Sequence, residues 1–540
     1  MEKVTRRKMI KNSMVTAAGW SIFPSELVPL AKEIPAGTGS VSFLPDWNHA
    51  GSTLRHTWEG LGNVDQFRWF VRRDMQDQLA VMQKDLNLRH VRAVGMFDDE
   101  LRVLGIDPTT WRDQDRKARY NWQVIDYVIE SLMNMGINPV ITTSFMPSGL
   151  SSGTQTCFST KANVCPPKDY REWTDLVTRT IRHFVERFGE SVVKSWYFEV
   201  WNEPNLDAFW KGADKAEFFK LYSTTWQAIK SVHPDLRLGG PSAARAEWIP
   251  EFIDFGRKNG CPADYIIAHV YNNDSEFAAL SPFDGPQNDK INQSPNFLPG
   301  VVKGTRKLLD EMGFKGELHF NEWGRSWFPS DSIRESQNEA AFIVKSMAGC
   351  SQHADYFAYW CLSDIYDQLG YGSETFHGNY GLMNLQGLKK PSYKAFQLLG
   401  KLGDTQVPLN TSNGNDLQNA IAAKGKNGYQ FLFYSFEKDF KPETSVPQKM
   451  SVSFRLPDRI NIDDIRVYRI GSTENNIFSK WKSIGSPAYL RKEELAELLK
   501  HNDLGKSGEK HKIDSTGGSR VMTVECESPG VALVEMNTNS

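Results

Sequence analysis

Eight short apolar segments, each typical of a buried strand, alternate in this chain with amphipathic stretches that are long enough to form helices. Strands that alternate with helices favour a parallel sheet, and eight such repeats predict a closed (β/α)8 barrel. A doubly wound sheet shares this alternation, but it carries a glycine-rich turn after its first strand, which this chain lacks. The predicted strands span residues 57–61, 90–94, 139–143, 195–202, 236–239, 265–270, 317–322 and 355–360, and helices are predicted over 74–85, 122–135, 169–188 and 217–232.

Short alternating strands replace this pattern from about residue 402 onward. Turn-rich or charged pieces separate them, which is typical of a β-sandwich. The predicted strands span 429–434, 450–454, 465–468 and 531–535, and one helix is predicted over 492–500. With 540 residues the chain is long enough for two domains. We therefore predict an α/β barrel over residues 41–400 and an accessory β-sandwich over residues 401–540.

Residues 1–36 have the character of an export signal followed by a linker. The pair Arg6-Arg7 precedes a weakly apolar stretch, which resembles a twin-arginine signal, and an ordinary secretory signal is the alternative. Ala31 and Ala36 are candidate cleavage sites. Either signal predicts a periplasmic or extracellular protein. No other segment is apolar for long enough to cross a bilayer.

Charge and cysteine usage exclude several classes of function. Acidic and basic residues are interspersed, with a formal net charge of −2, so no basic field for nucleic acid is present. The six cysteines show no Cys-x-x-Cys spacing, which argues against a zinc or redox site, and no cofactor is expected. Cys157 and Cys165 flank one loop, and in an oxidising compartment we expect them to form a disulfide, whereas the other four are expected to be buried thiols.

Two of the predicted barrel strands end in Asn-Glu, at Glu203 and at Glu322. A carboxyl group at the end of a buried strand is costly unless it has a function. In a closed barrel the ends of the fourth and seventh strands face each other across the mouth, so these two residues are expected to converge. Two carboxyl groups about 5–5.5 Å apart are the arrangement that cleaves a glycosidic bond with retention of configuration. Carboxylates this close cannot both ionise easily, which predicts that Glu203 stays protonated.

The chain resembles glycoside hydrolase family 39, which contains β-xylosidases and α-L-iduronidases. The resemblance runs from about Trp58 into the C-terminal region. The segments that carry it are Phe145-Met146-Pro147, Pro166-Pro167-Lys168-Asp169-Tyr170, Glu199-Val200-Trp201-Asn202-Glu203-Pro204-Asn205-Leu206, Gly239-Gly240-Pro241, His269-Val270-Tyr271, Asn321-Glu322, Tyr359-Trp360 and Phe376-His377-Gly378-Asn379-Tyr380-Gly381-Leu382. A lone Asn-Glu-Pro occurs in several retaining families, whereas this ordered set is specific.

The resemblance implies a role for each of these strand ends. Glu322 would be the nucleophile and Glu203 the acid/base, and Asn202 would bind the 2-hydroxyl of the sugar. Tyr271 would donate a hydrogen bond that keeps Glu322 ionised. His269 would orient nearby groups or be an ordinary core residue, and Trp360 would form an aromatic wall of the innermost sugar subsite. The sandwich would pack on the barrel and take the strand Val41 to Leu44 from the region that precedes the barrel.

The chain departs from the β-xylosidase pattern at positions near the sugar. Asn63 stands where an Arg is usual, Arg92 where a His is usual, and Asp367-Gln368 where two Glu residues are usual. Asp367 is therefore a candidate substrate-binding residue. Trp323-Gly324 replaces Tyr-Asn after the nucleophile and is followed by Arg325, which either grips an acidic group of the substrate or pairs with a nearby acid.

We therefore expect a retaining exo-glycosidase, a β-xylosidase acting on plant or algal glycans. Uronide-cleaving (iduronidase-like) or arabinose-cleaving activity is the alternative on the same scaffold, and a non-catalytic glycan-binding protein is the alternative of another class. The expected partner is an oligo- or polysaccharide. Family members often assemble, so both a monomer and a homo-oligomer stay open.

Overall fold

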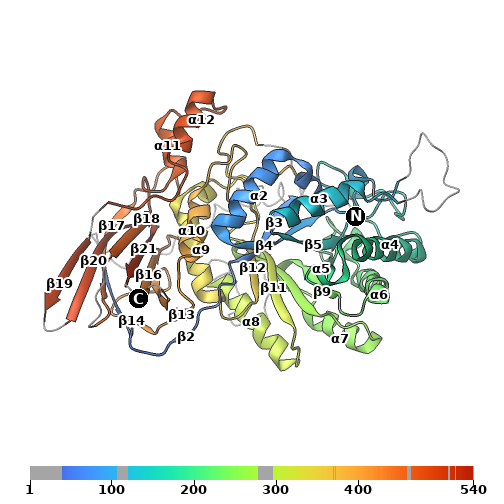
Figure 1. Ribbon diagram of the computed structural model, residues 1–540, viewed down its shortest axis with the longest axis horizontal. Helices are drawn as coiled ribbons and strands as arrows, with labels where there is room; N and C mark the ends of the chain where they lie inside the picture. The colour runs from blue at the N-terminus through green and yellow to red at the C-terminus, as the bar shows by residue number, and fades with distance from the viewer. Residues whose placement is uncertain are drawn as a thin grey trace, which may run out of the picture.

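The computed structural model describes residues 39–538, except 106–119, 278–295, 369, 371, 427, 459–463, 509–510 and 517–518. The predicted export signal lies outside the described residues. Figure 1 shows two side-by-side parts, a barrel wrapped by helices and a mainly β part that contains the C-terminus and the short helices α11 (Ile477–Ser483) and α12 (Lys492–Leu499). Within the part of the chain that the structure describes, no helix is long and apolar enough to cross a membrane.

Eight parallel strands form the barrel, as predicted. They are hydrogen-bonded in chain order, and the ring closes where the Phe357 amide donates to the Thr57 carbonyl (2.9 Å) and the Leu362 amide to the Asn63 carbonyl (2.9 Å). The strands are β3 (Gly60–Gln66), β4 (Leu88–Val94), β5 (Asn138–Thr143), β8 (Tyr197–Val200), β9 (Arg237–Ala243), β10 (Tyr265–Tyr271), β11 (Glu317–Gly324) and β12 (Tyr356–Tyr359). The predicted bounds of the first strand were wrong, because the ladder with β4 begins only at Gly60 and continues to Gln66.

Helices cover the outside of the barrel because each has one apolar face. In α2, for example, the buried residues Met75, Leu79, Met82 and Leu86 recur at the helical spacing. The amino ends of α4 and α6 are fixed by Asp169 and Asp214, whose carboxylates accept from backbone amides of the first turn. The main helices are α2 (Arg73–Leu86), α3 (Gln123–Asn134), α4 (Tyr170–Phe188), α6 (Lys215–Val232), α7 (Ile249–Asn259), α8 (Phe297–Glu311), α9 (Gln337–Cys350) and α10 (Pro391–Leu399).

Two sheets form the accessory domain, which is sandwich-like. One contains β14 (Leu409–Thr411), β1 (Gly39–Pro45), β17 (Gln448–Arg455), β20 (Ser519–Ser528) and β19 (His511–Thr516), in that order. The other contains β18 (Asp464–Ile470), β21 (Gly530–Asn537), β16 (Gly428–Ser435), β15 (Gln418–Gly425), β13 (Thr405–Gln406) and β2 (Ser52–Thr53). Their inner faces share a core in which the rings of Phe431 and Phe454 stack 4.1 Å apart. Strand β1, which precedes the barrel, runs parallel to β17 in this core.

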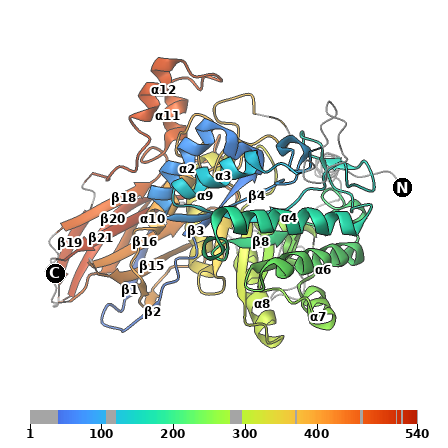
Figure 2. The ribbon, with the colours of Figure 1, turned by 45° about the vertical axis from the view of Figure 1, so that its right-hand side comes forward.

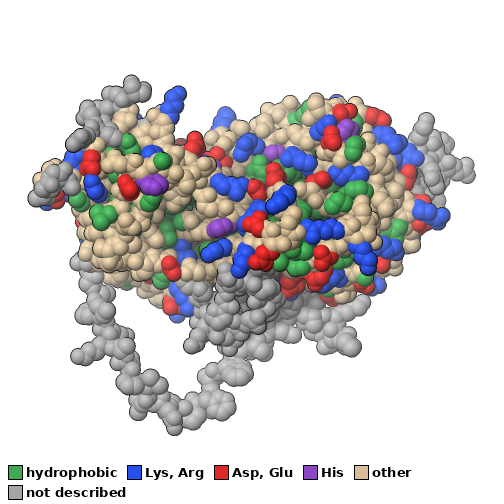
Figure 3. Space-filling model, turned by 90° about the horizontal axis from the view of Figure 1, so that it is seen from below, with side chains coloured by type: hydrophobic (Ala, Val, Ile, Leu, Met, Phe, Trp, Pro, Cys, Tyr) green, Lys and Arg blue, Asp and Glu red, His purple; other side chains and the backbone are tan. Residues whose placement is uncertain are grey.

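Helix α9 joins the two domains. Almost every residue of α9 is buried, because α8 and α10 pack against it on the barrel and the sheet of β16 and β21 packs against it from the accessory domain. Figure 2 shows the sheets of the accessory domain lying beside the barrel. Asn338 of α9 exchanges two hydrogen bonds with the backbone of Glu437, at 2.8 and 2.9 Å. A second connection comes from the short helices α11 (Ile477–Ser483) and α12 (Lys492–Leu499), which pack on Phe376. Figure 3 shows acidic and basic side chains intermixed over the face seen from below.

The predicted disulfide between Cys157 and Cys165 is absent. All six cysteines are thiols. The short hairpin of β6 (Thr156–Cys157) and β7 (Ala162–Asn163) sets Cys157 opposite Ala162, so Cys165 lies beyond the paired residues. The Sγ atom of Cys165 is buried and lies 3.8 Å from the Gln155 carbonyl oxygen instead.

Candidate active site

Glu203 lies just beyond β8, at the carboxyl-end face of the barrel. The backbone leaves the strand through the left-handed conformation at Trp201 (φ 67°) and again at Glu203 (φ 45°), which is unusual for residues other than glycine. The Glu203 amide donates to the Ser242 carbonyl (2.9 Å), which attaches this turn to the end of β9. The Glu203 side chain is thereby buried in the mouth, with 5% of its surface exposed.

Glu322 reaches the same point from β11. The Tyr271 hydroxyl donates to its Oε1 at 2.5 Å, so the predicted contact between these two side chains is present. Glu322 Oε2 lies 3.4 Å from His269 Nδ1 and 3.6 Å from Arg92 Nη1. A carboxylate oxygen of Glu203, a carboxylate oxygen of Glu322 and a ring nitrogen of His269 all lie within 4.8 Å of one another. The two carboxyl groups therefore converge as a retaining mechanism requires.

His269 lies between the two glutamates and is fully buried. Its Nδ1 is 3.2 Å from Glu203 Oε1, and its Nε2 is 3.2 Å from the Ser242 hydroxyl. The register of β10 on β11 pairs His269 with Glu322, which explains why the imidazole and the carboxylate meet. The structure therefore favours the orienting role for His269 over an ordinary core position. Because these three groups are also ligand types that divalent cations accept, chelation is a necessary control in any assay.

A buried ion pair lies beneath the two glutamates. Arg92 of β4 donates through Nε to Glu199 Oε1 (2.6 Å) and through Nη2 to Asn202 Oδ1 (2.8 Å), and both Arg92 and Glu199 are fully buried. The other oxygen of Glu199 accepts from Asn321 Nδ2 at 2.6 Å. Arg92 thus fixes Asn202, the predicted 2-hydroxyl ligand, and also places positive charge near Glu322.

The ionisation of Glu322 is set by opposing effects. Burial raises the pKa of Glu322 above its ordinary value, and the neighbouring Glu203 carboxyl group raises it further. His269 and Arg92 lower the pKa of Glu322 by favouring its charged form, and the hydrogen bond from Tyr271 acts in the same direction. The net direction is upward, so Arg92 and the hydrogen bond from Tyr271 offset only part of the cost of burying the Glu322 carboxylate.

An aromatic cluster borders Tyr271. Its other buried members are Trp327, Trp360, Cys361, Tyr366 and Tyr380. Trp360 directly follows β12, and its amide donates to the Trp323 carbonyl of β11 at 2.9 Å. Trp360 therefore lies in one cluster with Tyr271, which contacts Glu322, and its role as a wall of the innermost subsite stays a prediction.

Two predicted substrate-binding residues are engaged elsewhere. Arg325 donates through Nε to Glu339 Oε2 (2.8 Å) and forms an ion pair with Asp331, so the alternative interpretation of a paired arginine is the one that the contacts support. Asp367 accepts from Arg68 Nη2 with both carboxylate oxygens, at 2.6 and 2.7 Å. Among the described residues, neither Arg325 nor Asp367 forms a hydrogen bond or an ion pair with Glu203 or Glu322.

Sequence reasoning missed Glu199 and Asn321 as functional residues and treated Arg92 only as a departure. A signal for Glu199 was present, because an acid inside an otherwise apolar strand needs a buried partner. A signal for Arg92 was equally present, since a charged residue in the second strand must also find a partner. That they pair with each other follows only from the order of the strands around the barrel.

The fold and the paired carboxylates define a retaining glycoside hydrolase built on a (β/α)8 barrel. The profile of glycosyl hydrolases family 39 matches residues 45–514, and the chain belongs to this family. A β-xylosidase of Caldicellulosiruptor saccharolyticus is 34% identical over 81% of this chain and 86% of its own length. Human α-L-iduronidase is 31% identical, over only 29% of this chain and 23% of its own length. The crystal structure of a monomeric β-xylosidase from Caulobacter crescentus CB15 matches with a TM-score of 0.79 and 28% identity, and the match covers 93% of this chain and all of that one.

Proposed function

We propose that the protein is an exo-acting β-xylosidase that removes single xylose residues from plant or algal glycans. The observation that carries the proposal is the convergence of Glu203 and Glu322 within 4.8 Å, in a chain that is 34% identical to a β-xylosidase over most of its length. The ion pairs of Arg325 leave no free guanidinium after the nucleophile to read a substrate carboxylate, which favours a neutral sugar over a uronide.

The chemistry follows from the geometry in two displacements. In the first, Glu322 attacks the anomeric carbon, the glycosidic C–O bond breaks, and Glu203 gives its proton to the leaving oxygen. In the second, Glu203 takes a proton from water, which attacks the anomeric carbon and displaces Glu322. Tyr271 and Arg92 stabilise the Glu322 carboxylate before attack and after release. Asn202, oriented by Arg92, would bind the sugar 2-hydroxyl.

The test is a panel of aryl glycosides, comprising β-xyloside, α-L-arabinoside, β-glucoside and α-L-iduronide. We expect the β-xyloside to have the highest kcat/KM, and Glu322→Gln to abolish its turnover. Glu317→Gln is the matched control, because Glu317 begins the same strand and pairs with Tyr197 and His319 at the opposite end of the barrel. Faster turnover of the iduronide would replace this proposal with the uronidase alternative. No turnover of any glycoside by the folded protein would favour the non-catalytic one.

We also propose that the chain is exported and is periplasmic or extracellular, because residues 1–36 resemble an export signal. Fractionation of cells expressing the full chain tests this, with Arg6→Lys/Arg7→Lys as the variant that separates a twin-arginine signal from an ordinary secretory one.

The oligomeric state is a separate question. Light scattering during size-exclusion chromatography distinguishes a monomer from a homo-oligomer.

A further inference from the structure

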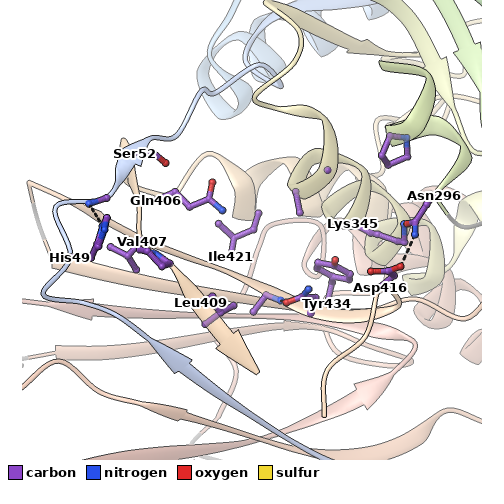
Figure 4. Close-up of a pocket in the computed structure, with 17 residues that line it drawn as sticks. His49, Ser52, Asn296, Lys345, Gln406, Val407, Leu409, Asp416, Ile421 and Tyr434 are labelled. Atoms are coloured by element: carbon purple, nitrogen blue, oxygen red, sulfur yellow. Dashed lines mark hydrogen bonds between the residues drawn. The ribbon is translucent and has the colours of Figure 1, made fainter. Parts of the chain in front are cut away.

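A cavity of about 550 Å³ lies where the sandwich meets the flank of the barrel (Figure 4). Its walls come from the segment before β2, from α9 and the start of α8, and from strands β13 to β16. The volume is within the range of small-molecule sites. None of the described residues that line the cavity belongs to the group formed by Glu203, Glu322, His269, Arg92 and Tyr271. The cavity is therefore separate from the site of Glu203 and Glu322.

Tyr434 is the most informative residue of this cavity. Only 5% of its surface is exposed, and it lines the cavity between the two polar ends (Figure 4). Its hydroxyl has no hydrogen-bond partner among the residues that the structure describes, and it is not one of the buried atoms, so it is accessible from the cavity. Burial raises the pKa of Tyr434, so the hydroxyl stays protonated and can donate. A hydroxyl donor that lies on a largely buried side chain and opens into a cavity of this size points to a ligand with hydroxyl groups.

The two ends of the cavity are polar. At one end Lys345 donates to Asn296 Oδ1 (2.9 Å), and Asn296 Nδ2 donates to Asp416 Oδ2 (2.6 Å). At the other end lies Gln406, whose side-chain amide makes no hydrogen bond with the described residues. Lys345 and Asp416 carry opposite charges, and burial lowers the pKa of Lys345 to about 8, so this end holds no strong excess of charge. Amides, hydroxyls and an aromatic ring without excess charge suit a neutral saccharide better than an anion.

We propose that this cavity is a second, non-catalytic binding site for a neutral saccharide, a segment of the glycan that the enzyme degrades. The inference rests on the chain being a glycoside hydrolase and not on which sugar it releases. Tyr434 and Gln406 hydrogen-bond hydroxyl groups of the saccharide, and the tyrosine ring contacts an apolar face of the sugar. The site holds the substrate chain at the enzyme while the catalytic mouth acts on a chain end.

Isothermal titration of the full-length Glu322→Gln protein with xylohexaose, cellohexaose and mannohexaose tests this proposal. We expect at least one hexasaccharide to occupy two sites per chain. Tyr434→Phe, added to Glu322→Gln, removes one hydrogen bond and weakens one of the two sites by about 5-fold. Gln406→Ala weakens the same site. Tyr429→Phe, which removes a hydroxyl from the same strand outside the cavity, leaves both sites unchanged.

The proposal is overturned if every hexasaccharide occupies at most one site per chain, or if two sites exist and neither responds to Tyr434→Phe or Gln406→Ala. A change in thermal stability without any change in binding also overturns it, because the cavity would then serve packing only. Failure of the proposed function looks different. In that case the aryl β-xyloside is not hydrolysed while the second site and its response to Tyr434→Phe persist.

Discussion

Replacing Tyr271 with phenylalanine tests whether one hydrogen bond keeps the nucleophile ionised. The Tyr271 hydroxyl donates to Glu322 Oε1 at 2.5 Å in a fully buried setting, and the substitution removes this donor while preserving the ring. A hydrogen bond to a charged group contributes about 1.5–3 kcal/mol. Because a tenfold change in ionisation corresponds to about 1.4 kcal/mol, the pKa of Glu322 should rise by about 1 to 2 pH units.

The sign of the effect on activity follows from the role of Glu322. The nucleophile acts as the anion, so kcat/KM falls as the pH drops through the pKa of Glu322. Tyr271→Phe should move this acidic limb to higher pH, and at a fixed pH below the limb kcat/KM should fall by about 10- to 100-fold. At pH values well above the limb much of the activity should return.

The assay is the pH dependence of kcat/KM for the aryl glycoside that the enzyme turns over fastest. Tyr265→Phe is the matched control, because Tyr265 also lies on β10 and its buried hydroxyl donates to the Phe198 carbonyl (2.6 Å), away from the glutamates. We expect Tyr265→Phe to lower stability without moving the limb. An acidic limb at the same pH in Tyr271→Phe and in the unaltered protein would refute the reasoning.

Three further predictions concern the buried charges and the thiols. Arg92→Met leaves Glu199 buried without its cation and should lower the free energy of unfolding, measured by urea denaturation, by about 3–5 kcal/mol. Adding Glu199→Gln to the Arg92→Met protein should recover part of this loss. Burial raises the pKa of Asp98 to about 7 from an ordinary 3.8, so the free energy of unfolding should decrease as the pH rises from about 4 to 7. Urea denaturation measured across that pH range should show a smaller decrease for Asp98→Asn. Thiol titration of the denatured, unreduced protein should find six thiols, and a count of four would restore the Cys157–Cys165 disulfide.

The barrel and the catalytic pair were predictable because their signals are local. Each strand is an apolar run between helices, and Glu203 and Glu322 each end such a run in a motif that the family shares. The contact of Tyr271 with Glu322 was expected from the family resemblance, and the structure contains it. The exact start of the first strand was not predictable, because the chain around Thr57 and Gly60 is fixed by its contacts with β12 and β4.

The contacts among Arg92, Glu199 and Asn321 could not be read from the sequence, because each joins strands that are far apart along the chain. Arg325 illustrates the same limit from the other direction. Its position after Glu322 suggested a contact with the substrate. Its guanidinium instead forms ion pairs with Asp331 and Glu339, and the local sequence pattern does not predict that these two acids lie beside it. Likewise, the spacing of Cys157 and Cys165 suggested a bridge that the register of a short hairpin prevents.

Under the proposed mechanism, the charges around Glu203 and Glu322 account for Glu203 acting first as an acid and then as a base. Arg92 is a fully buried cation beside Glu199 and Glu322, so if both of these are ionised, a proton on Glu203 keeps the site from gaining a further uncompensated negative charge. When Glu322 bonds to the sugar it loses its charge, and the repulsion that opposed ionisation of Glu203 disappears. Glu203 can then remain an anion after giving up its proton and accept one from water. The exchange of roles thus follows from a shared charge balance and needs no movement of the backbone.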